Sequence, residues 1–242
     1  TLESIYIPEG LSDTSILFFS DLKYGPFMKE QRLQKLVQAI NNLSPDVVIF
    51  GGDLFADDYK PSEDDKNIVK TTLKEICAPL GKFAVLGDTD QETLDDMGTN
   101  KGLLYEADFE VLDNKSISIR NFGSDSITLV GLQNSVNGYA DITTAYENIS
   151  RSSFTIAICH TPDTAKDVPT DLTKYFLAGH SLGGQVYYGL GSLYTPLKAD
   201  YYFKGKHTVN DSVTLDITSG TGTVIKDVRF LSNAEIVLYR LK

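Results

Sequence analysis

The first half of the chain alternates short apolar segments with segments of helical periodicity, and this alternation restricts the possible folds more than any other feature. Apolar runs at 16–19, 47–50 and 83–86 are separated by stretches that predict helices over about 29–42 and 65–76. Short strands that are apolar throughout belong in a sheet covered on both faces. Strands joined through helices run parallel to one another. The pattern therefore predicts a β-α-β-α-β unit.

The second half of the chain is richer in strands. Apolar or alternating runs bounded by turn residues occur at 110–112, 116–120, 127–132, 154–160, 175–178, 213–217 and 235–241. Two sheets sandwiched between helices would accommodate this many strands, so we expect an α/β fold with four layers, α/β/β/α. The sequence contains no long linker, internal repeat or low-complexity tract, and we therefore expect a single domain over residues 1–242.

Composition excludes some classes of function and leaves the compartment open. The chain has 22 basic and 33 acidic side chains and a formal charge of −11, which disfavours nucleic acid and anionic membrane surfaces as partners. No apolar run approaches the roughly 18 residues that span a bilayer. The chain starts at Thr1. We therefore keep open a removed N-terminal anchor, with the domain on the extracytoplasmic side of a membrane, and otherwise expect a cytoplasmic location. Oligomeric state is not predicted.

Acidic and imidazole side chains follow five of the predicted strands. These residues are Asp21, Asp53, Asp88, His160 and His180. A single aspartate after a strand is often only a turn or helix-cap residue. Five such positions together are harder to explain that way, because loops at the carboxyl ends of parallel strands converge on one crevice. Carboxylates gathered there would repel one another without a cation between them. The set therefore predicts a site for a divalent metal ion.

The segments around these residues resemble the motifs of the calcineurin-like metallophosphoesterases. The family pattern is D-x-H, G-D-x-x-D, G-N-H-[DE], a lone His, and G-H-x-H. The corresponding segments here are 21–23, 52–57, 87–90, His160 and 179–182. The similarity is greatest to a bacterial branch whose members often have an N-terminal membrane anchor, and the tail from 217 to 241 also resembles that branch. The resemblance implies the metallophosphoesterase form of the four-layer fold, with two mixed sheets, and a phosphoester substrate.

Two departures from the family pattern affect the first of the family's two metal sites. The resemblance implies that Asp53 would bridge both metals and that the first metal would also use Asp21. Its other two ligands are histidines in the family, but Lys23 and Leu182 stand at those positions here, and neither can replace an imidazole. We hypothesise that the Lys23 ammonium occupies this site between Asp21 and Asp53. The alternative is that Lys23 extends into solvent beside a decayed pocket.

The second metal site keeps all of its ligands. The resemblance assigns it Asp53, Asp88, His160 and His180. We therefore expect one divalent ion, manganese, zinc or iron. The candidate catalytic residues are Lys23, Thr89 and His180. Thr89 stands where the family has a histidine that helps to protonate the leaving group, so a general acid worth on the order of 10² to 10⁴ in rate is missing. Weak or restricted phosphoester hydrolysis is the predicted activity, and no substrate-binding residue is assigned.

Two alternatives remain at this stage. In the first, the chain is a catalytically inactive relative that binds a ligand or partner, without any metal. In the second, Ser181 is the nucleophile of a serine hydrolase, because 179–183 also reads G-x-S-x-G and is followed by Asp200 and His207 in the required order. A nucleophile elbow requires a helix directly after the serine, whereas the sequence after Ser181 is interrupted by glycines. The serine-hydrolase reading also leaves the five strand-end residues unexplained.

Overall fold

The fold is described from a computed structural model that covers residues 1–121, 123–188, 191–192 and 194–242. Its first sheet has the strand order β11-β1-β2-β3-β4. The strands are β1 (Ser15–Phe19), β2 (Val47–Phe50), β3 (Lys82–Ala84), β4 (Glu110–Val111) and β11 (Val237–Arg240). Strands β1 to β4 are parallel, and β11 adds to the edge antiparallel to β1, with Ser15 opposite Arg240. The predicted parallel unit of the first half is confirmed.

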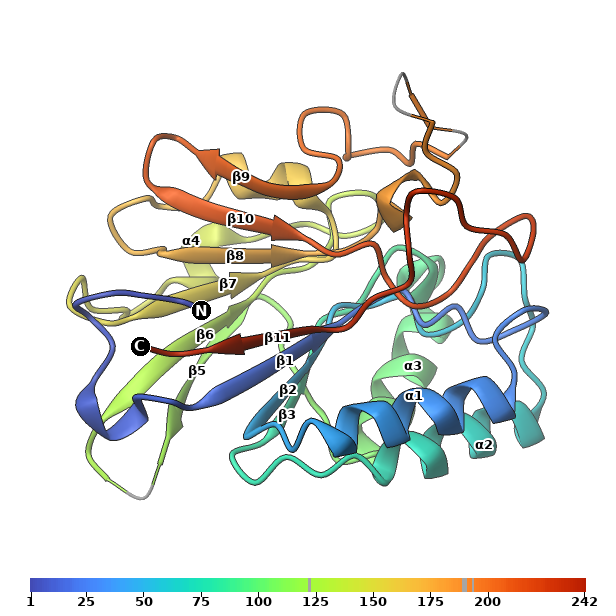
Figure 1. The fold of residues 1–242 in the computed structure, drawn as a ribbon, viewed down its shortest axis with the longest axis horizontal. Coiled ribbons are helices and arrows are strands. Elements are labelled where there is room, and N and C mark those ends of the chain that lie inside the picture. Colours follow the sequence, from blue (N-terminus) through green and yellow to red (C-terminus); the bar gives the residue numbers. More distant parts are fainter. Residues whose placement is uncertain (122, 189–190, 193) are drawn as a thin grey trace.

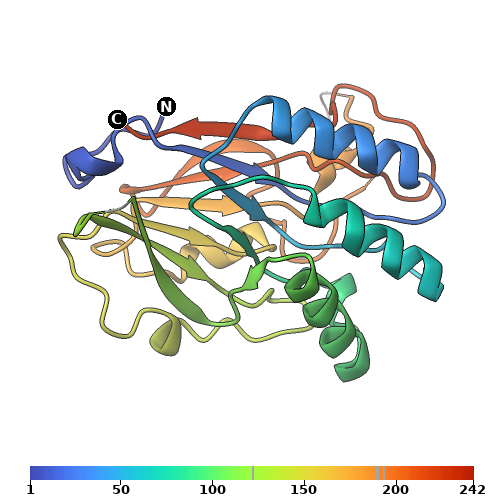
Figure 2. The same ribbon diagram turned by 90° about the horizontal axis from the view of Figure 1, so that it is seen from below.

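Three helices lie side by side on the outer face of this sheet (Figures 1 and 2). They are α1 (Glu30–Asn42), α2 (Glu63–Lys74) and α3 (Leu94–Glu106). Helix α1 buries Leu33, Val37 and Ile40, which recur at helical spacing. Helix α2 begins with a capping box, in which Ser62 and Asp65 satisfy each other's backbone N–H groups. Amphipathic spacing and caps thus account for α1 and α2.

The second sheet has the strand order β5-β6-β7-β8-β10-β9. Its strands are β5 (Lys115–Arg120), β6 (Ser126–Gly131), β7 (Thr155–Ile158), β8 (Tyr175–Ala178), β9 (Gly205–Val209) and β10 (Val213–Ile217). The four central strands are parallel, and the two edge strands are antiparallel to their neighbours. Helix α4 (Ile142–Ala145) and a 3-10 helix (Pro162–Lys166) follow two of these strands. The expected α/β/β/α architecture is confirmed, although the fourth layer contains only these short elements and loops.

Apolar side chains of β1 alternate between two cores. Leu17 and Phe19 pack with the helices, whereas Ile16 and Phe18 pack between the two sheets. A third cluster lies on the other face of the second sheet and includes Phe176. Because both faces of each central strand are covered, the strands are apolar throughout rather than alternating.

The parallel strands of both sheets end on the same side of the molecule. In Figure 1 the arrowheads of β1, β8 and β10 point toward the loops on the right, while β11 runs the opposite way. The loops that follow β1, β2, β3, β7 and β8 therefore meet at one edge of the two-sheet sandwich. Within the described ranges, every helix is too short or too polar to cross a membrane.

Candidate metal centre

Four side chains from four different loops converge at this edge. Asp53 follows β2, Asp88 follows β3, His160 follows β7 and His180 follows β8. One ligand atom of each residue lies within 4.8 Å of the ligand atoms of the other three. Asp53, His160 and His180 are buried, and Asp88 is 23% exposed in its side chain. The structure thus brings together the four residues predicted for the second metal site.

Hydrogen bonds to main-chain carbonyls orient both imidazoles. The Nδ1 atom of His160 lies 2.7 Å from the carbonyl oxygen of Gly51, and the Nε2 atom of His180 lies 2.7 Å from that of Leu197. A carbonyl can only accept, so each of these ring nitrogens is the donor. In a neutral ring the other nitrogen then has a free lone pair, and in both residues it faces the cluster. Metal-ligating histidines are commonly held in this way.

Partnerless polar atoms are concentrated at the same point. Among the described residues, six buried side-chain nitrogen or oxygen atoms have no hydrogen-bond partner, and they include Asp88 Oδ1, His160 Nε2 and His180 Nδ1. The carboxylate oxygen lies 3.3 Å from the His160 nitrogen and 3.0 Å from the His180 nitrogen. Lone pairs that face one another at such distances repel unless a proton or cation lies between them. The donor set therefore fits a divalent ion.

The electrostatic environment of the centre favours positive charge. Burial opposes a charge on His160, but the carboxylates of Asp53 and Asp88 outweigh burial and hold the pKa of His160 well above its ordinary value. Burial also opposes the charge on Asp53, yet His160 and Lys23 keep the pKa of that carboxyl below its usual range. The centre thus attracts cations strongly.

Asp21 lies beside the four-residue cluster and outside it. One of its carboxylate oxygens accepts the backbone N–H of His180 at 3.0 Å. The other lies 4.0 Å from His160 Nε2 and has no hydrogen-bond partner. Burial, followed by the neighbouring Asp53 charge, raises the pKa of Asp21, against the opposing effects of His160 and Lys23. Asp21 is therefore a carboxylate without a full set of partners, next to the cluster.

The Lys23 side chain is buried within the site and does not reach solvent. It is 2% exposed, and its Nζ lies 2.7 Å from Asp53 Oδ2 and 2.5 Å from Asp57 Oδ1. Burial alone would lower the pKa of Lys23, but these two carboxylates hold it well above its ordinary value. The sequence hypothesis placed the ammonium between Asp21 and Asp53. Its second partner is instead Asp57, because the loop after β2 returns that carboxylate to Lys23.

Thr89 and Asp90 hold the loop after β2 in place. The Thr89 backbone N–H and hydroxyl lie 3.1 and 2.9 Å from Asp53 Oδ1, and the hydroxyl is also 3.1 Å from the Phe55 carbonyl oxygen. Asp90 is fully buried and accepts the N–H groups of Asp53, Leu54 and Gly87. Burial and the Asp53 charge nevertheless raise the pKa of Asp90 to about 6. Thr89 thus orients Asp53. The single hydroxyl proton of Thr89 already has acceptors in Asp53 and the Phe55 carbonyl.

Two residues of the serine-hydrolase alternative, Ser181 and His207, have hydrogen-bond partners other than each other. Ser181 is buried, and its hydroxyl accepts the N–H of Gly183 in a 3-10 turn at Leu182–Gly184. His207 lies on β9, where its ring bonds the Lys204 carbonyl. No hydrogen bond joins Ser181 to a histidine or a carboxylate in the part of the chain that the structure describes. Leu182 is fully buried, and its aliphatic side chain offers no metal ligand to the neighbouring centre.

Close packing of Gly87 against Asp53 leads to a stability prediction. A Cβ atom at position 87 would lie 2.6 Å from the Asp53 backbone nitrogen and closer still to its carboxylate. Gly87→Ala is therefore expected to destabilise the protein by about 1–3 kcal/mol through overpacking. Gly98 in α3 has open space around it, so Gly98→Ala should stabilise by about 0.5–1 kcal/mol. Urea unfolding of both variants measures the two shifts, and shifts of the same sign would contradict the packing argument.

Asp163 fixes the segment that orients His180. Its carboxylate accepts three successive backbone N–H groups at 200–202, at 2.9 to 3.1 Å. This segment adjoins Leu197, whose carbonyl accepts from the His180 ring. Loss of a direct partner of a metal-ligating histidine costs 10- to 100-fold in metal affinity. Asp163 acts on that partner only through the chain, so Asp163→Ala should weaken Mn²⁺ binding by about tenfold, the lower end of this range.

Asp167 provides the matched control for this prediction. It is exposed at the end of the same 3-10 helix, so Asp167→Ala should leave the Mn²⁺ dissociation constant unchanged. Titration of both variants with Mn²⁺ tests the role of Asp163. Equal affinities in the two variants would mean that Asp163 does not position His180.

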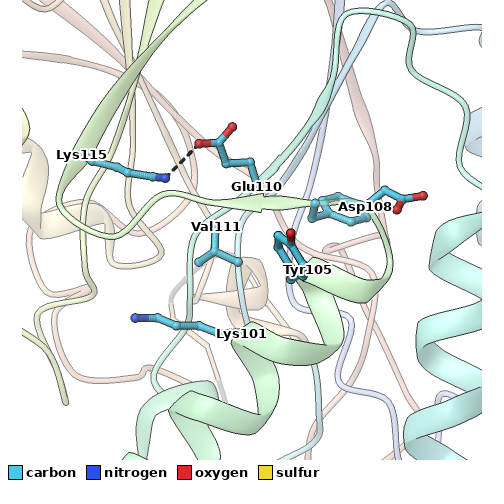
Figure 3. A pocket seen from close by; sticks show the side chains of 7 residues that line it. Lys101, Tyr105, Asp108, Glu110, Val111 and Lys115 are labelled. Atoms are coloured by element: carbon cyan, nitrogen blue, oxygen red, sulfur yellow. Dashed lines mark hydrogen bonds and ion pairs between the residues drawn. The ribbon is translucent and has the colours of Figure 1, made fainter.

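A hollow of about 600 Å³ lies elsewhere, at the edge of the first sheet (Figure 3). It is lined by the end of α3 and by β4, and it includes Lys101, Tyr105 and Val111. Lys115 forms an ion pair with Glu110 at 2.9 Å across it. None of its lining residues belongs to the four-residue cluster. Its volume is therefore no evidence that it is the catalytic site.

Comparison with known proteins relates the chain to one family. A family model described as calcineurin-like phosphoesterase matches residues 14–188. The segment contains Asp53, Asp88, His160 and His180, and it ends shortly after the last of them. The match thus covers the strands whose loops form the cluster.

Relatives and solved structures extend this comparison. The uncharacterized metallophosphoesterase YkuE of Bacillus subtilis is 27% identical over 246 residues, covering 100% of this chain and 84% of the relative. A transmembrane protein with metallophosphoesterase domain from Danio rerio is 27% identical, and 98% of this chain spans 55% of its length. The UDP-2,3-diacylglucosamine pyrophosphatase LpxG of Chlamydia muridarum is 25% identical over 71% of this chain and 64% of its own. A dimetal phosphatase from Danio rerio has a similar fold, with a TM-score of 0.50 at 9% identity over 95% of this chain and 93% of that chain.

Proposed function

The chain belongs to the calcineurin-like phosphoesterase family, and we propose that it hydrolyses phosphoesters with one divalent metal ion, while the Lys23 ammonium takes the place of a second. The observation that supports this most directly is the buried Lys23 ion pair, with Nζ 2.7 Å from Asp53 Oδ2. A carboxylate oxygen that accepts from an ammonium at this distance is not free to bridge two metal ions. Asp53 would therefore be a ligand of one metal ion only.

The residues that would hold this ion are Asp53, Asp88, His160 and His180, whose ligand atoms lie within 4.8 Å of one another. When bound, a divalent ion supplies Lewis acidity toward a phosphoryl oxygen and makes a water molecule nucleophilic near neutral pH. Manganese, zinc and iron all accept this mixture of oxygen and imidazole donors. Leu182 and Lys23 supply no ligand for another ion on the Asp21 side.

Lys23 would contribute to the reaction as a fixed positive charge. Its ammonium has three N–H donors, and Asp53 and Asp57 take two of them. The third can point toward a phosphoryl oxygen of the substrate. A charge that is already in place when the phosphorane-like transition state forms costs no reorganisation, which is the basis of electrostatic catalysis. Lys23 would thus replace the charge of a second metal but not its ability to activate water.

The rate should depend steeply on the leaving group. The hydroxyl proton of Thr89 has acceptors at Asp53 and Phe55, and an alcohol is too weak an acid to protonate a departing alkoxide. Without a general acid, substrates with acidic leaving groups such as aryl oxides or phosphates should react fastest. Aryl phosphoester and pyrophosphate bonds both meet this condition, and the related LpxG is named as a pyrophosphatase.

Turnover with defined metal content tests the proposal. The metal-free protein would be titrated with Mn²⁺, Zn²⁺ or Fe²⁺ and assayed on p-nitrophenyl and phenyl esters of the same phosphate. We expect activity to saturate at one ion per chain and the p-nitrophenyl ester to react far faster. Absence of both metal binding and turnover would support an inactive relative that only binds a ligand or partner. Saturation at two ions per chain would contradict the role given to Lys23.

A further inference from the structure

An apolar hollow of about 350 Å³ lies between the loop that contains His180 and the loop between β10 and β11. Its walls include Val186 and Tyr194 from the first loop and Val224, Ile225 and Val228 from the second. A hollow of this volume is within the range of small-molecule sites. Its lining is formed almost entirely by aliphatic and aromatic carbon atoms.

The Gln185 side chain at this hollow is already paired. Gln185 lines it, and its side-chain amide donates to the carbonyls of Val224 and Lys226 and accepts the N–H of Val224. Each of these bonds is between 2.7 and 2.9 Å long. Lys226 also lines the hollow, and it is an exposed residue. Since both N–H donors of this amide are used within the protein and the lining is largely apolar, the hollow favours an apolar group.

Backbone hydrogen bonds hold the two walls together. The N–H of Tyr187 donates to the Phe230 carbonyl at 2.8 Å, and the N–H of Phe230 donates to the Gln185 carbonyl at 2.9 Å. These bonds join the loops as two strands of a small ladder. The hollow is therefore preformed and does not need a ligand to assemble it.

Two apolar residues of the lining are exposed, and one of them has a strained backbone. Ile225 is 78% exposed and Val228 is 55% exposed. Ile225 also has a φ of 60°, in the left-handed region that β-branched residues rarely adopt. Such strain persists where the surrounding structure imposes it, often at ligand-binding positions. The conformation of Ile225 is thus imposed by its loop and not by its own backbone preference.

The hollow adjoins the metal centre through both loops. Gly184 and Gln185 follow the His180 turn directly. A Cβ atom at Gly222, in the other loop, would lie 2.6 Å from the Lys23 Cβ. Tyr194 lines the hollow, and its hydroxyl lies close enough to Lys23 and Asp57 for their charges to affect its pKa, which burial raises. A molecule with its phosphate at the metal centre can thus extend an attached chain into the hollow.

From this continuity we infer that the substrate is an amphiphilic phosphoester whose alkyl chain enters the hollow lined by Val186, Tyr194, Val224, Ile225 and Val228. The inference rests on the proposed function for its phosphate group and on the hollow for its chain. Each buried methylene strengthens binding roughly fourfold, so three of them give roughly 60-fold. Chain length, rather than a specific polar headgroup, should therefore control the apparent affinity.

The test compares methyl p-nitrophenyl phosphate with octyl p-nitrophenyl phosphate, which share one leaving group, below the concentration at which the octyl ester forms micelles. Calorimetric binding of methylphosphonate and octylphosphonate to the Mn²⁺-loaded protein provides a readout that needs no turnover. For the wild-type chain we expect the octyl compound to be favoured by at least about 60-fold in kcat/KM and in affinity. Ile225→Gly, which also relieves the positive φ, should reduce this ratio at least tenfold, and Val228→Asn should reduce it similarly.

Leu231 provides the matched control. It is also an exposed apolar residue with a positive φ of 50°, but it is not part of the lining, so Leu231→Gly should leave the ratio unchanged. Equal rates and affinities for both chain lengths would overturn the inference while leaving the proposed function intact. An equal loss in Leu231→Gly and Ile225→Gly would also overturn it, because the preference would then come from general surface adsorption. Octyl selectivity in phosphonate binding without turnover of either ester would support the hollow and refute the proposed function.

Discussion

Replacing Lys23 with methionine should destabilise the metal-free protein by about 3 kcal/mol. Methionine keeps most of the side-chain volume but leaves the buried Asp53 carboxylate without its ammonium partner. Breaking a buried ion pair costs about 3–5 kcal/mol. The lower end applies because His160 Nε2 remains 3.0 Å from the same carboxylate oxygen. Urea unfolding with a chelator present measures the loss. Mn²⁺ should restore more stability to Lys23→Met than to the wild type, because a cation can then neutralise the freed carboxylate.

Lys70 provides the control for this measurement. It pairs with Glu106 at 2.8 Å, but its side chain is 28% exposed and that of Glu106 is 60% exposed. Pairs of this kind contribute about 0–1 kcal/mol, so Lys70→Met should have little effect. A loss in Lys23→Met no larger than that in Lys70→Met would show that the Asp53 carboxylate does not depend on the ammonium.

Removal of a metal ligand should have the largest effect on metal binding and turnover. In His160→Asn the imidazole is lost, and we expect the Mn²⁺ dissociation constant to rise at least about 100-fold, since loss of an outer-shell partner alone costs 10- to 100-fold. Turnover at limiting Mn²⁺ should fall by the same factor. Because His160 is fully buried, Asp88→Ala is a second variant at a less buried ligand, with the same expectation.

His207 is the matched control, since the chain has only three histidines. It lies on β9 and packs against Tyr202 in a tilted arrangement, with ring centroids 5.3 Å apart. His207→Ala should leave both metal affinity and turnover unchanged. Unchanged Mn²⁺ binding in both His160→Asn and Asp88→Ala would place the metal elsewhere in the protein.

The sequence predicted ten of the eleven strands, but it did not predict strand β9 or the helices α3 and α4. Helix α3 was not predicted because Asn100 and Leu104 are its only buried residues and two glycines interrupt it, so it has no apolar stripe. Its N-cap, where Thr93 accepts from the Asp96 N–H, was the available signal. Strand β9 escaped because it is a mostly exposed edge strand whose only fully buried residue is Val209.

The strand-end residues of the site could be predicted because the carboxyl ends of parallel strands meet at one edge of a sheet. The groups that orient their side chains could not be predicted. The carbonyls of Gly51 and Leu197 fix the two imidazoles, and a backbone carbonyl has no identity in the sequence. The Lys23 position was predicted, but its partner was not, because the return of Asp57 toward the ammonium depends on the path of a loop with positive φ at Asp53. The partners of these side chains therefore depend on local backbone geometry, which the order of the motifs does not reveal.

The most direct test of a single metal site beside a buried ammonium is anomalous diffraction at the manganese edge, from crystals soaked in excess Mn²⁺. We expect one peak, liganded by Asp53, Asp88, His160 and His180, with the Lys23 Nζ still between Asp53 and Asp57. A second peak of similar height between Asp21 and Asp53, with Lys23 turned away, would contradict the account.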